Sequence, residues 1–435
     1  MKKNASKMTR SAGWLTALSL LSVLSGCSLG QKPGVSAPPQ PSAIVTSTAT
    51  PLPSASSASS ATASPSAKPT ATPDPWAGWT LDDKIGQLII AGIDGTTVTD
   101  QTRELITKYH LGGILLYKPN VTSTKQLVAL TNGIKLANRV NKQPLWLGAD
   151  EEGGRVTRLP DELVKTPTSQ AIGQSGKLQL ARDTGALLGK EMAAYGFNMD
   201  FAPVLDVNSN PKNPVIGDRS FGAKPALVSD FGVGMMKGIQ ASRVVPVVKH
   251  FPGHGDTSVD SHVGLPVVQN DLNRLRQFEL VPFARAIAEG ADSVMVAHIL
   301  LPKIDQNNPA SMSSLIMTDL LRKEMKFQGV IMTDDLTMGA ITEHQDIGDA
   351  AVQSVLAGAN QVMAGHGAEN VIRVFQALHA AVDKGTLPVD VLNERLSRIV
   401  QLKRKYALQN NEVSVPDLTA FNKEAQRIAA AVSHK

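Results

Sequence analysis

The amino-acid sequence predicts an α/β fold, a TIM-like (β/α)₈ barrel formed by one catalytic domain. Eight short apolar runs recur along the chain, and a helical pattern follows each of them. Several of these runs end in a charged or hydrogen-bonding residue. In a barrel the carboxyl ends of all strands meet on one face, so residues far apart in the sequence become neighbours there. The pattern alone leaves a doubly wound open sheet as the alternative.

Residues 1–27 are expected to form a lipoprotein signal peptide. A basic start precedes an apolar run, Trp14–Leu24, which is too short to cross a bilayer as a permanent helix. The segment ends in a motif that resembles the bacterial lipobox, Leu24-Ser25-Gly26-Cys27. This resemblance implies cleavage before Cys27 and lipidation of its thiol. We therefore expect a lipid-anchored protein on the extracytoplasmic face of the cell membrane, in a bacterial envelope.

Residues 28–75 are predicted to be a disordered linker. They consist mostly of Ser, Thr, Ala and Pro, and only Lys32, Lys68 and Asp74 are charged. Such a segment cannot bury enough apolar surface to fold. We expect an extended tether that holds the folded domain away from the membrane.

The charge distribution argues against a nucleic-acid partner. The formal net charge is +5, but four basic residues and no acidic residue lie in the signal peptide. The remaining chain carries 39 Lys and Arg against 38 Asp and Glu, so it has no marked excess of positive charge.

Cys27 is the only cysteine, which excludes an intramolecular disulfide. We expect a monomer.

Residues 76–410 have the composition of a globular domain. Thr80, followed three residues later by Asp83, predicts the cap of a first helix. The predicted strands are Gly86–Ile90, Gly112–Tyr117, Leu145–Asp150, Asn198–Val204, Val244–His250, Ser293–His298, Gly329–Asp334 and Gln361–Ala364. The clearest helical patterns between them are Leu178–Tyr195, Ala226–Ala241, Asp271–Glu289 and Ser314–Met325.

Residues 411–435 are expected to form a tail. Their one amphipathic stretch, Leu418–Ala431, predicts either a terminal helix packed on the barrel or a frayed end. The segment is too short for a second domain.

The stretch Lys249–His262 is the first candidate for a functional site. It follows an apolar run, Val244–Val248, and contains three His, two Asp and one Lys among glycine and proline residues. A buried strand that opens into such a polar loop is where a barrel enzyme places its chemistry.

Two kinds of catalytic group stand out. Asp334 follows the apolar run Val330–Thr333, which should place its carboxylate rigidly at a strand end, where it can attack an electrophilic carbon. His262 lies on the loop, two residues after Asp260. In an extended segment these two side chains would point the same way, so the carboxylate can orient the imidazole as a general acid and base.

The sequence resembles glycoside hydrolase family 3, specifically its bacterial β-N-acetylglucosaminidases. The similarity spans roughly residues 80–408. Besides Lys249–Pro266, the matching segments are Asp150–Arg158, Phe201–Val207, Asn213–Gly222, Ala297-His298 and Thr333–Ala340.

The resemblance implies a retaining hydrolase that releases terminal β-linked N-acetylglucosamine through a covalent glycosyl-enzyme. Its nucleophile maps onto Asp334, with Asp335 as the weaker candidate, and its acid/base maps onto His262, oriented by Asp260. The implied sugar-binding residues are Asp150, Arg158, Arg219, Lys249 and His250. No metal and no cofactor are expected. The expected substrates are peptidoglycan fragments in which N-acetylglucosamine is linked to N-acetylmuramic acid.

Two departures from the family pattern matter. Glu151 stands where many relatives carry Gln. Many Gram-positive relatives also carry a second α/β domain after the barrel, and we expect none in this chain because too few residues follow the predicted barrel.

Several alternatives stay open. The family also contains phosphorylases, which pass the glycosyl group to phosphate, and broader β-glucosidases. The ligand-type side chains of the loop would suit a metallohydrolase, although their spacing matches no zinc motif. A non-catalytic glycan-binding lipoprotein is the alternative from another class. The sequence also leaves open whether His254 and Asp256 brace the loop or act directly, and whether His366 faces the pocket.

Overall fold

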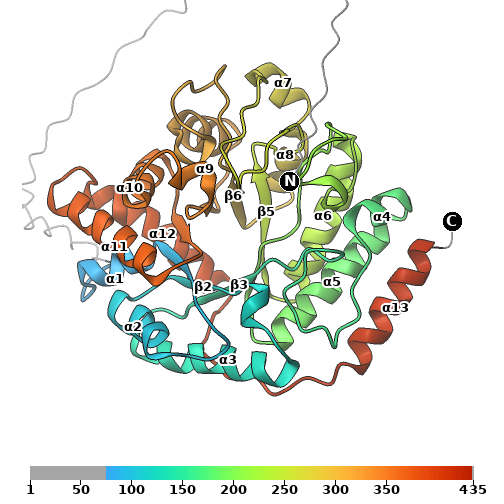
Figure 1. The fold of residues 1–435 in the computed structure, drawn as a ribbon, viewed down its shortest axis with the longest axis horizontal. Coiled ribbons are helices and arrows are strands. Elements are labelled where there is room, and N and C mark those ends of the chain that lie inside the picture. Colours follow the sequence, from blue (N-terminus) through green and yellow to red (C-terminus); the bar gives the residue numbers. More distant parts are fainter. Residues whose placement is uncertain (1–74, 434–435) are drawn as a thin grey trace, which may run out of the picture. The chain divides into compact units, whose positions relative to one another are not determined.

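A closed barrel of eight parallel strands forms the centre of the computed structural model, which describes residues 75–433 (Figure 1). The strands pair in sequence order, and β8 pairs with β1, so the predicted barrel is confirmed and the open sheet is wrong. The expected signal peptide, Cys27 and the linker lie outside the described residues, apart from the linker's last residue. The strands are β1 (Ile89–Gly92), β2 (Gly113–Leu115), β3 (Trp146–Ala149), β4 (Met199–Asp200), β5 (Val245–Phe251), β6 (Ser293–Val296), β7 (Val330–Asp335) and β8 (Gln361–Ala364).

Helices surround this barrel (Figure 1). The α-helices are α1 (Leu81–Gly86), α2 (Asp100–Tyr109), α3 (Thr124–Ala137), α4 (Ser169–Gln174), α5 (Leu178–Ala194), α6 (Pro225–Ala241), α7 (Leu272–Gln277), α8 (Val281–Ala288), α9 (Gly339–Thr342), α10 (Ile347–Ala357), α11 (Ala368–Asp383), α12 (Val389–Lys405) and α13 (Thr419–Ser433). The other helical turns are η1 (Lys118–Asn120), η2 (Asn138–Val140), η3 (Gly217–Arg219), η4 (Ala310–Met312) and the π-helix η5 (Leu315–Glu324).

The barrel interior is filled with side chains. One apolar cluster takes at least one residue from every strand, including Ile90, Trp146, Val247, Met332 and Met363. Trp146 is fully buried there, so it is a core residue and not an exposed platform for a sugar. Because the interior is packed, a ligand can bind only at an end of the barrel.

Several predicted elements differ from the structure, and the predicted strand Asn198–Val204 is reduced to β4, Met199–Asp200. The predicted helix Asp271–Glu289 is two helices, α7 and α8, which break at Phe278; Pro282 lies in the first turn of α8, where its missing N–H costs no hydrogen bond. The predicted strand Gly86–Ile90 starts too early, because α1 extends to Gly86.

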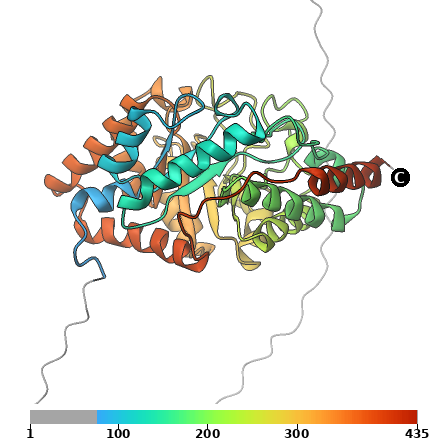
Figure 2. The ribbon, with the colours of Figure 1, turned by 90° about the horizontal axis from the view of Figure 1, so that it is seen from below.

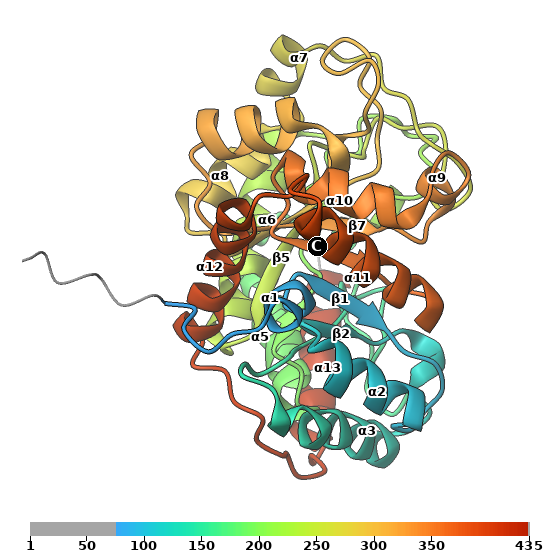
Figure 3. The same ribbon diagram turned by 90° about the vertical axis from the view of Figure 1, so that its left-hand side faces the viewer.

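The C-terminal segment is ordered by contacts with distant parts of the barrel. Helix α12 packs beside α1 (Figure 3), and the chain then crosses the molecule to α13, which lies along α5 (Figure 2). On the way Asn132 exchanges two hydrogen bonds with the backbone of Val413. Of the two expectations for this segment, the packed helix is therefore confirmed. Among residues 75–433 we find no helix with the length and apolar character to cross a membrane.

Candidate active site

A polar cavity of about 470 Å³ lies at the carboxyl ends of the barrel strands. Residues at the ends of β2, β3, β5, β7 and β8 form much of its wall. The structure brings all eight residues predicted for catalysis or sugar binding into this wall: Asp150, Arg158, Arg219, Lys249, His250, Asp260, His262 and Asp334.

Asp334 lies at the end of β7 and reaches the cavity. Its Oδ1 accepts a hydrogen bond from the backbone N–H of Asp335 (2.9 Å). Burial raises the pKa of Asp334, but the charges of His250 and His298 and this N–H outweigh burial and hold the pKa below its usual value. The carboxylate therefore stays ionised near neutral pH, as a nucleophile requires.

Asp335 is engaged by its surroundings. Its Oδ1 accepts hydrogen bonds from the N–H groups of Thr337 (2.9 Å) and Gly365 (2.8 Å), and its Oδ2 accepts one from Tyr117 (3.0 Å). Gly365 allows this close approach, because a Cβ there would lie 2.2 Å from Asp335 Oδ2. Of the two adjacent aspartates, Asp334 is thus the better placed to react.

His262 and Asp260 form the predicted pair. Both His262 Nδ1 (2.8 Å) and the backbone N–H of His262 (2.9 Å) contact Asp260 Oδ1. The pair lies in a turn closed by the N–H of Gly264 on Asp260 O, so the extended geometry expected from the sequence is wrong. The imidazole is 67% exposed.

The loop of His262 is tied to the element that follows Asp334. The N–H of Ala340, in α9, donates to Ser261 O (3.2 Å). A Cβ at Gly339 would lie 2.9 Å from His262 O, so glycine permits the contact. These contacts hold the histidine loop against the segment after β7, and both His262 and Asp334 line the cavity.

A buried charge network forms the floor of the cavity. Lys249 Nζ lies 2.6 Å from Asp150 Oδ1 and 2.7 Å from Glu152 Oε1. Burial lowers the pKa of Lys249, but the two carboxylates outweigh it and raise the pKa above its usual value. The side chain of Lys249 is 2% exposed and that of Asp150 is 20% exposed, so Asp150 is the more accessible charged group for a ligand.

Two arginines complete this network. Arg219 donates from Nε (2.8 Å) and Nη2 (2.7 Å) to the two oxygens of Glu152, a bidentate pair. Burial raises the pKa of Glu152, but the charges of Arg219 and Lys249 outweigh burial and hold the pKa below its usual value. The carboxylate therefore stays ionised. Arg158 Nη2 lies 3.5 Å from Asp150 Oδ2. Fixed cations and anions of this kind can hold sugar hydroxyls.

The neighbouring histidines are held by other side chains. Asp206, behind the wall, accepts from His250 Nδ1 (2.6 Å) and from the N–H of His254 (2.6 Å). The two ring nitrogens of His254 contact Thr257 (2.9 Å) and Ser261 (3.2 Å). Burial first, and the charge of His250 second, lower the pKa of His254 to about 4, so it is neutral at pH 7.

The sequence left the roles of several other residues undecided, and the structure shows that some line the cavity and others hold neighbouring segments. His254 and His366 line the cavity, and His366 stacks on Tyr117 with ring centroids 4.5 Å apart. Asp256 instead accepts a hydrogen bond from Asn270 (3.1 Å). His298 is fully buried behind Asp335, where its Nε2 donates to Asp335 O (3.0 Å).

Comparison with known protein families shows which family this chain belongs to. The family model described as "Glycosyl hydrolase family 3 N terminal domain" matches residues 80–402. The chain belongs to glycosyl hydrolase family 3. The matched residues include every predicted catalytic and sugar-binding residue, whereas α13 lies beyond them.

Several family 3 proteins are similar to this chain. Beta-hexosaminidase A of Pseudoalteromonas piscicida is 36% identical over 362 residues, which span 78% of this chain and 60% of that protein. The structure of a family 3 β-N-acetylglucosaminidase from Paenibacillus sp. strain FPU-7 has a TM-score of 0.77 and 38% identity, covering 81% of this chain and 69% of that one. NagZ from Neisseria gonorrhoeae, solved in complex with N-trifluoroacetyl-D-glucosamine, has a TM-score of 0.67 and 27% identity, covering 80% and 98%.

Sequence reasoning missed some residues of this family 3 site. Glu152 was part of a matching segment, but its bonds to Lys249 and Arg219 depend on how the loop after β3 folds back. Tyr117 was also missed, because its hydrogen bond to Asp335 joins positions far apart in the sequence and no local pattern indicates it. The spacing of Asp150 and Glu152, two residues apart after a buried strand, was the one signal that could have indicated a second inward carboxylate.

The histidine at the end of β5 and those of the loop after it find partners within the protein. His250, His254 and His262 each use a ring nitrogen for the hydrogen bonds described above. Within residues 75–433 no three or more His, Cys, Asp or Glu side chains form a group that could hold a metal ion.

Proposed function

We propose that this family 3 protein is an exo-acting, retaining β-N-acetylglucosaminidase. Family membership makes a carbohydrate its substrate. The observation that carries the proposal is that an ionised Asp334 and the Asp260–His262 pair line one cavity with a set of fixed charges suited to a sugar. Relatives that are named beta-hexosaminidase or β-N-acetylglucosaminidase support the choice of sugar.

The reaction takes two steps. In the first, Asp334 attacks the anomeric carbon of the terminal sugar, the bond to the leaving oxygen breaks, and His262 gives its proton to that oxygen. A glycosyl ester on Asp334 results. In the second step water attacks the same carbon, His262 takes a proton from the water, and Asp334 leaves as a carboxylate. Two inversions give net retention.

Asp260 positions the acid/base group. Its carboxylate accepts from His262 Nδ1, which leaves Nε2 to exchange the proton with the substrate. Burial raises the pKa of Asp260, but its contacts with the backbone and ring of His262 outweigh burial and lower it, so Asp260 stays ionised. The exposed loop position of His262 allows the ring to approach a bound leaving group.

The shape of the site supports cleavage at a chain end. The packed barrel interior closes the cavity beneath the network of Lys249 and Glu152, so a glycan can enter with its terminal sugar but cannot pass through. We propose peptidoglycan fragments with terminal N-acetylglucosamine on N-acetylmuramic acid as the substrates. The expected location motivates this choice, together with the relatives above.

The expected anchor is part of this proposal. Lipidation of Cys27 would hold the enzyme at the extracytoplasmic face of the membrane, where such fragments arise. We propose that it acts there as a monomer. Replacing Cys27 by Ala is expected to release the protein from the membrane fraction with its activity intact. Membrane retention of the Cys27→Ala protein would contradict the anchor.

The direct test compares wild type with Asp334→Asn. On nitrophenyl N-acetylglucosaminide and on the N-acetylglucosaminyl-N-acetylmuramic acid disaccharide, the variant should lose at least about 10³-fold in kcat. Asp256→Asn is the matched control, because Asp256 lies on the neighbouring loop and contacts Asn270. Undiminished turnover by Asp334→Asn would reject the proposed nucleophile. Glycosyl phosphate as the main product in the presence of phosphate would make the enzyme a phosphorylase.

A further inference from the structure

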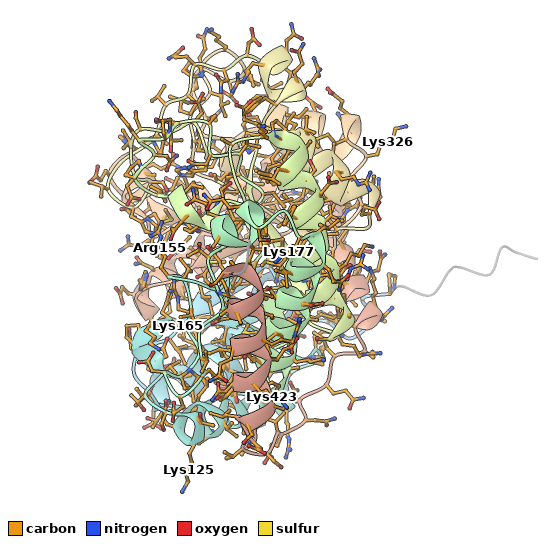
Figure 4. The ribbon with its side chains drawn as sticks, turned by 90° about the vertical axis from the view of Figure 1, so that its right-hand side faces the viewer. Lys125, Arg155, Lys165, Lys177, Lys326 and Lys423 are labelled. Carbon is orange, nitrogen blue, oxygen red and sulfur yellow. The ribbon has the colours of Figure 1, made fainter. Side chains whose placement is uncertain are left out.

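Helix α13 lies outside the residues matched by family 3 and packs against a segment of the active site. Ala425 and Ile428 of α13 are fully buried in a small apolar cluster with Leu187 of α5. Val164, from the β3–α4 segment (residues 150–168), packs against the same cluster. In Figure 4, α13 carries the label Lys423, and Lys165 of the β3–α4 segment lies beside the helix.

One side chain of α13 joins it to this segment by two hydrogen bonds. Asn422 Oδ1 accepts from the backbone N–H of Val164 (2.8 Å), and Asn422 Nδ2 donates to the backbone oxygen of Glu162 (3.1 Å). A single amide thus satisfies a backbone donor and a backbone acceptor in the same turn. Because the two bonds run in opposite directions, they fix both the amide and the backbone that it holds.

The same segment carries the sugar-binding residues at its other end. Asp150, Glu152, Arg155 and Arg158 all belong to it and line the cavity. In Figure 4, Arg155 lies away from α13, at the edge of the molecule. Arg158 precedes Glu162 by four residues, so the amide of Asn422 holds backbone close to a cation that the proposed function assigns to the sugar.

Other contacts make the segment a connected unit. The side chain of Glu151 accepts from the backbone N–H groups of Arg158 (2.9 Å) and Leu159 (3.2 Å), and Lys118 donates to the backbone oxygen of Leu159 (2.9 Å). The N–H of Gly154 donates to the oxygen of Thr166 (3.1 Å). These bonds place Arg158 and the backbone held by Asn422 within one connected stretch of chain.

We propose that Asn422 is a positioning residue of the active site, which holds the β3–α4 segment in the conformation that binds the terminal sugar. The inference rests on the proposed function. Without the amide, residues 159–164 gain conformational freedom, and the ligand must order them again when it binds. This cost falls on substrate binding, so KM should rise while kcat changes little.

The test compares Asn422→Ala with Arg427→Ala in the full-length protein. Arg427 is also on α13, but it contacts Asp183 of α5 (2.5 Å) and Glu424 (2.7 Å), and not the β3–α4 segment. Both variants remove hydrogen bonds of α13, so both report on its packing. Three readouts are taken from each: KM and kcat on nitrophenyl N-acetylglucosaminide, the melting temperature, and amide hydrogen exchange of residues 151–168.

We expect Asn422→Ala to raise KM about three- to tenfold, with kcat within about twofold, and to speed exchange in residues 151–168. Arg427→Ala should leave KM and that exchange unchanged, whatever its melting temperature. An unchanged KM in Asn422→Ala, or an equal rise of KM in both variants, would reject the proposal, because α13 would then contribute only to packing. If wild type fails to cleave N-acetylglucosaminides, the proposed function is rejected. Unchanged hydrogen exchange of residues 151–168 in Asn422→Ala would reject the positioning role of Asn422 independently of that function.

Discussion

Glu152 illustrates how one residue can organise the cavity without touching the leaving group. It bonds to both Lys249 and Arg219, and all three side chains are largely buried. A buried cation that loses its anion keeps its desolvation cost without compensation. The two cations that we propose bind the sugar therefore depend on a carboxylate that was not predicted from the sequence as a site residue.

We expect Glu152→Gln to raise KM at least about tenfold and to lower the free energy of unfolding by about 2 kcal/mol, because the amide removes a charge between two buried cations. Steady-state kinetics and urea unfolding would measure the two effects. Glu104→Gln is the control, because Glu104 pairs with Lys108 on the exposed surface and should change neither. An unaltered KM in Glu152→Gln would show that Lys249 and Arg219 hold their positions without it.

His262→Ala should depend on the leaving group. Loss of a general acid and base lowers a rate by about 10²–10⁴-fold where the leaving oxygen needs a proton, as in the disaccharide. Nitrophenolate leaves without much protonation, so the loss in glycosylation should be smaller on the nitrophenyl glycoside. The ratio of kcat/KM on the two substrates measures this. An exposed histidine changed in the same way, His344→Ala, should leave the ratio unaltered, and equal losses on both substrates would speak against His262 as the acid.

At the scale of elements, local patterns located the helices and strands, and tertiary contacts decided their ends. The cap predicted at Thr80 is present, with Thr80 Oγ1 accepting from the N–H of Asp83 (3.0 Å), because this signal needs only residues within one turn. The break between α7 and α8 was missed, although Pro282 indicated a helix start. The turn of Asp260 and His262 was also missed, since alternation of side chains assumes an extended chain.

Helix α5 contains a buried acid whose protonation should be measurable. Glu191 is 3% exposed, and its Oε1 has no hydrogen-bond partner within the described residues. Burial, and to a lesser extent the charge of Glu151, raise the pKa of Glu191 to about 9. The folded protein thus holds a proton there that the unfolded chain releases above its ordinary pKa of about 4.3.

Stability should therefore fall as pH rises from about 5 toward 9, by up to about 1.4 kcal/mol per pH unit from this one group. Glu191→Gln removes the titration, so the variant should gain stability relative to wild type between pH 5 and pH 8. Urea unfolding at several pH values would measure the difference. Stability curves that stay parallel over this range would mean that Glu191 is already ionised in the folded protein.

At the scale of the whole molecule, the fold could be predicted because each strand appears in the sequence as an apolar run and closure follows from their number. The common face of the barrel also follows, which is why Asp150, Lys249 and Asp334 were expected from the sequence to meet. The depth of each group in the cavity could not be predicted. It depends on loops such as residues 150–168, whose shape is set by Lys118 and by Asn422, a residue of the far C-terminal helix.

The proposed mechanism depends above all on Asp334 as the nucleophile that bonds to the anomeric carbon. A fluorinated N-acetylglucosaminide that glycosylates an enzyme faster than it is released should trap the intermediate, and mass spectrometry of the digested protein locates it. We predict one sugar on the peptide that contains Asp334, and no label on that peptide in Asp334→Asn. A sugar attached to any peptide without Asp334 would contradict the mechanism.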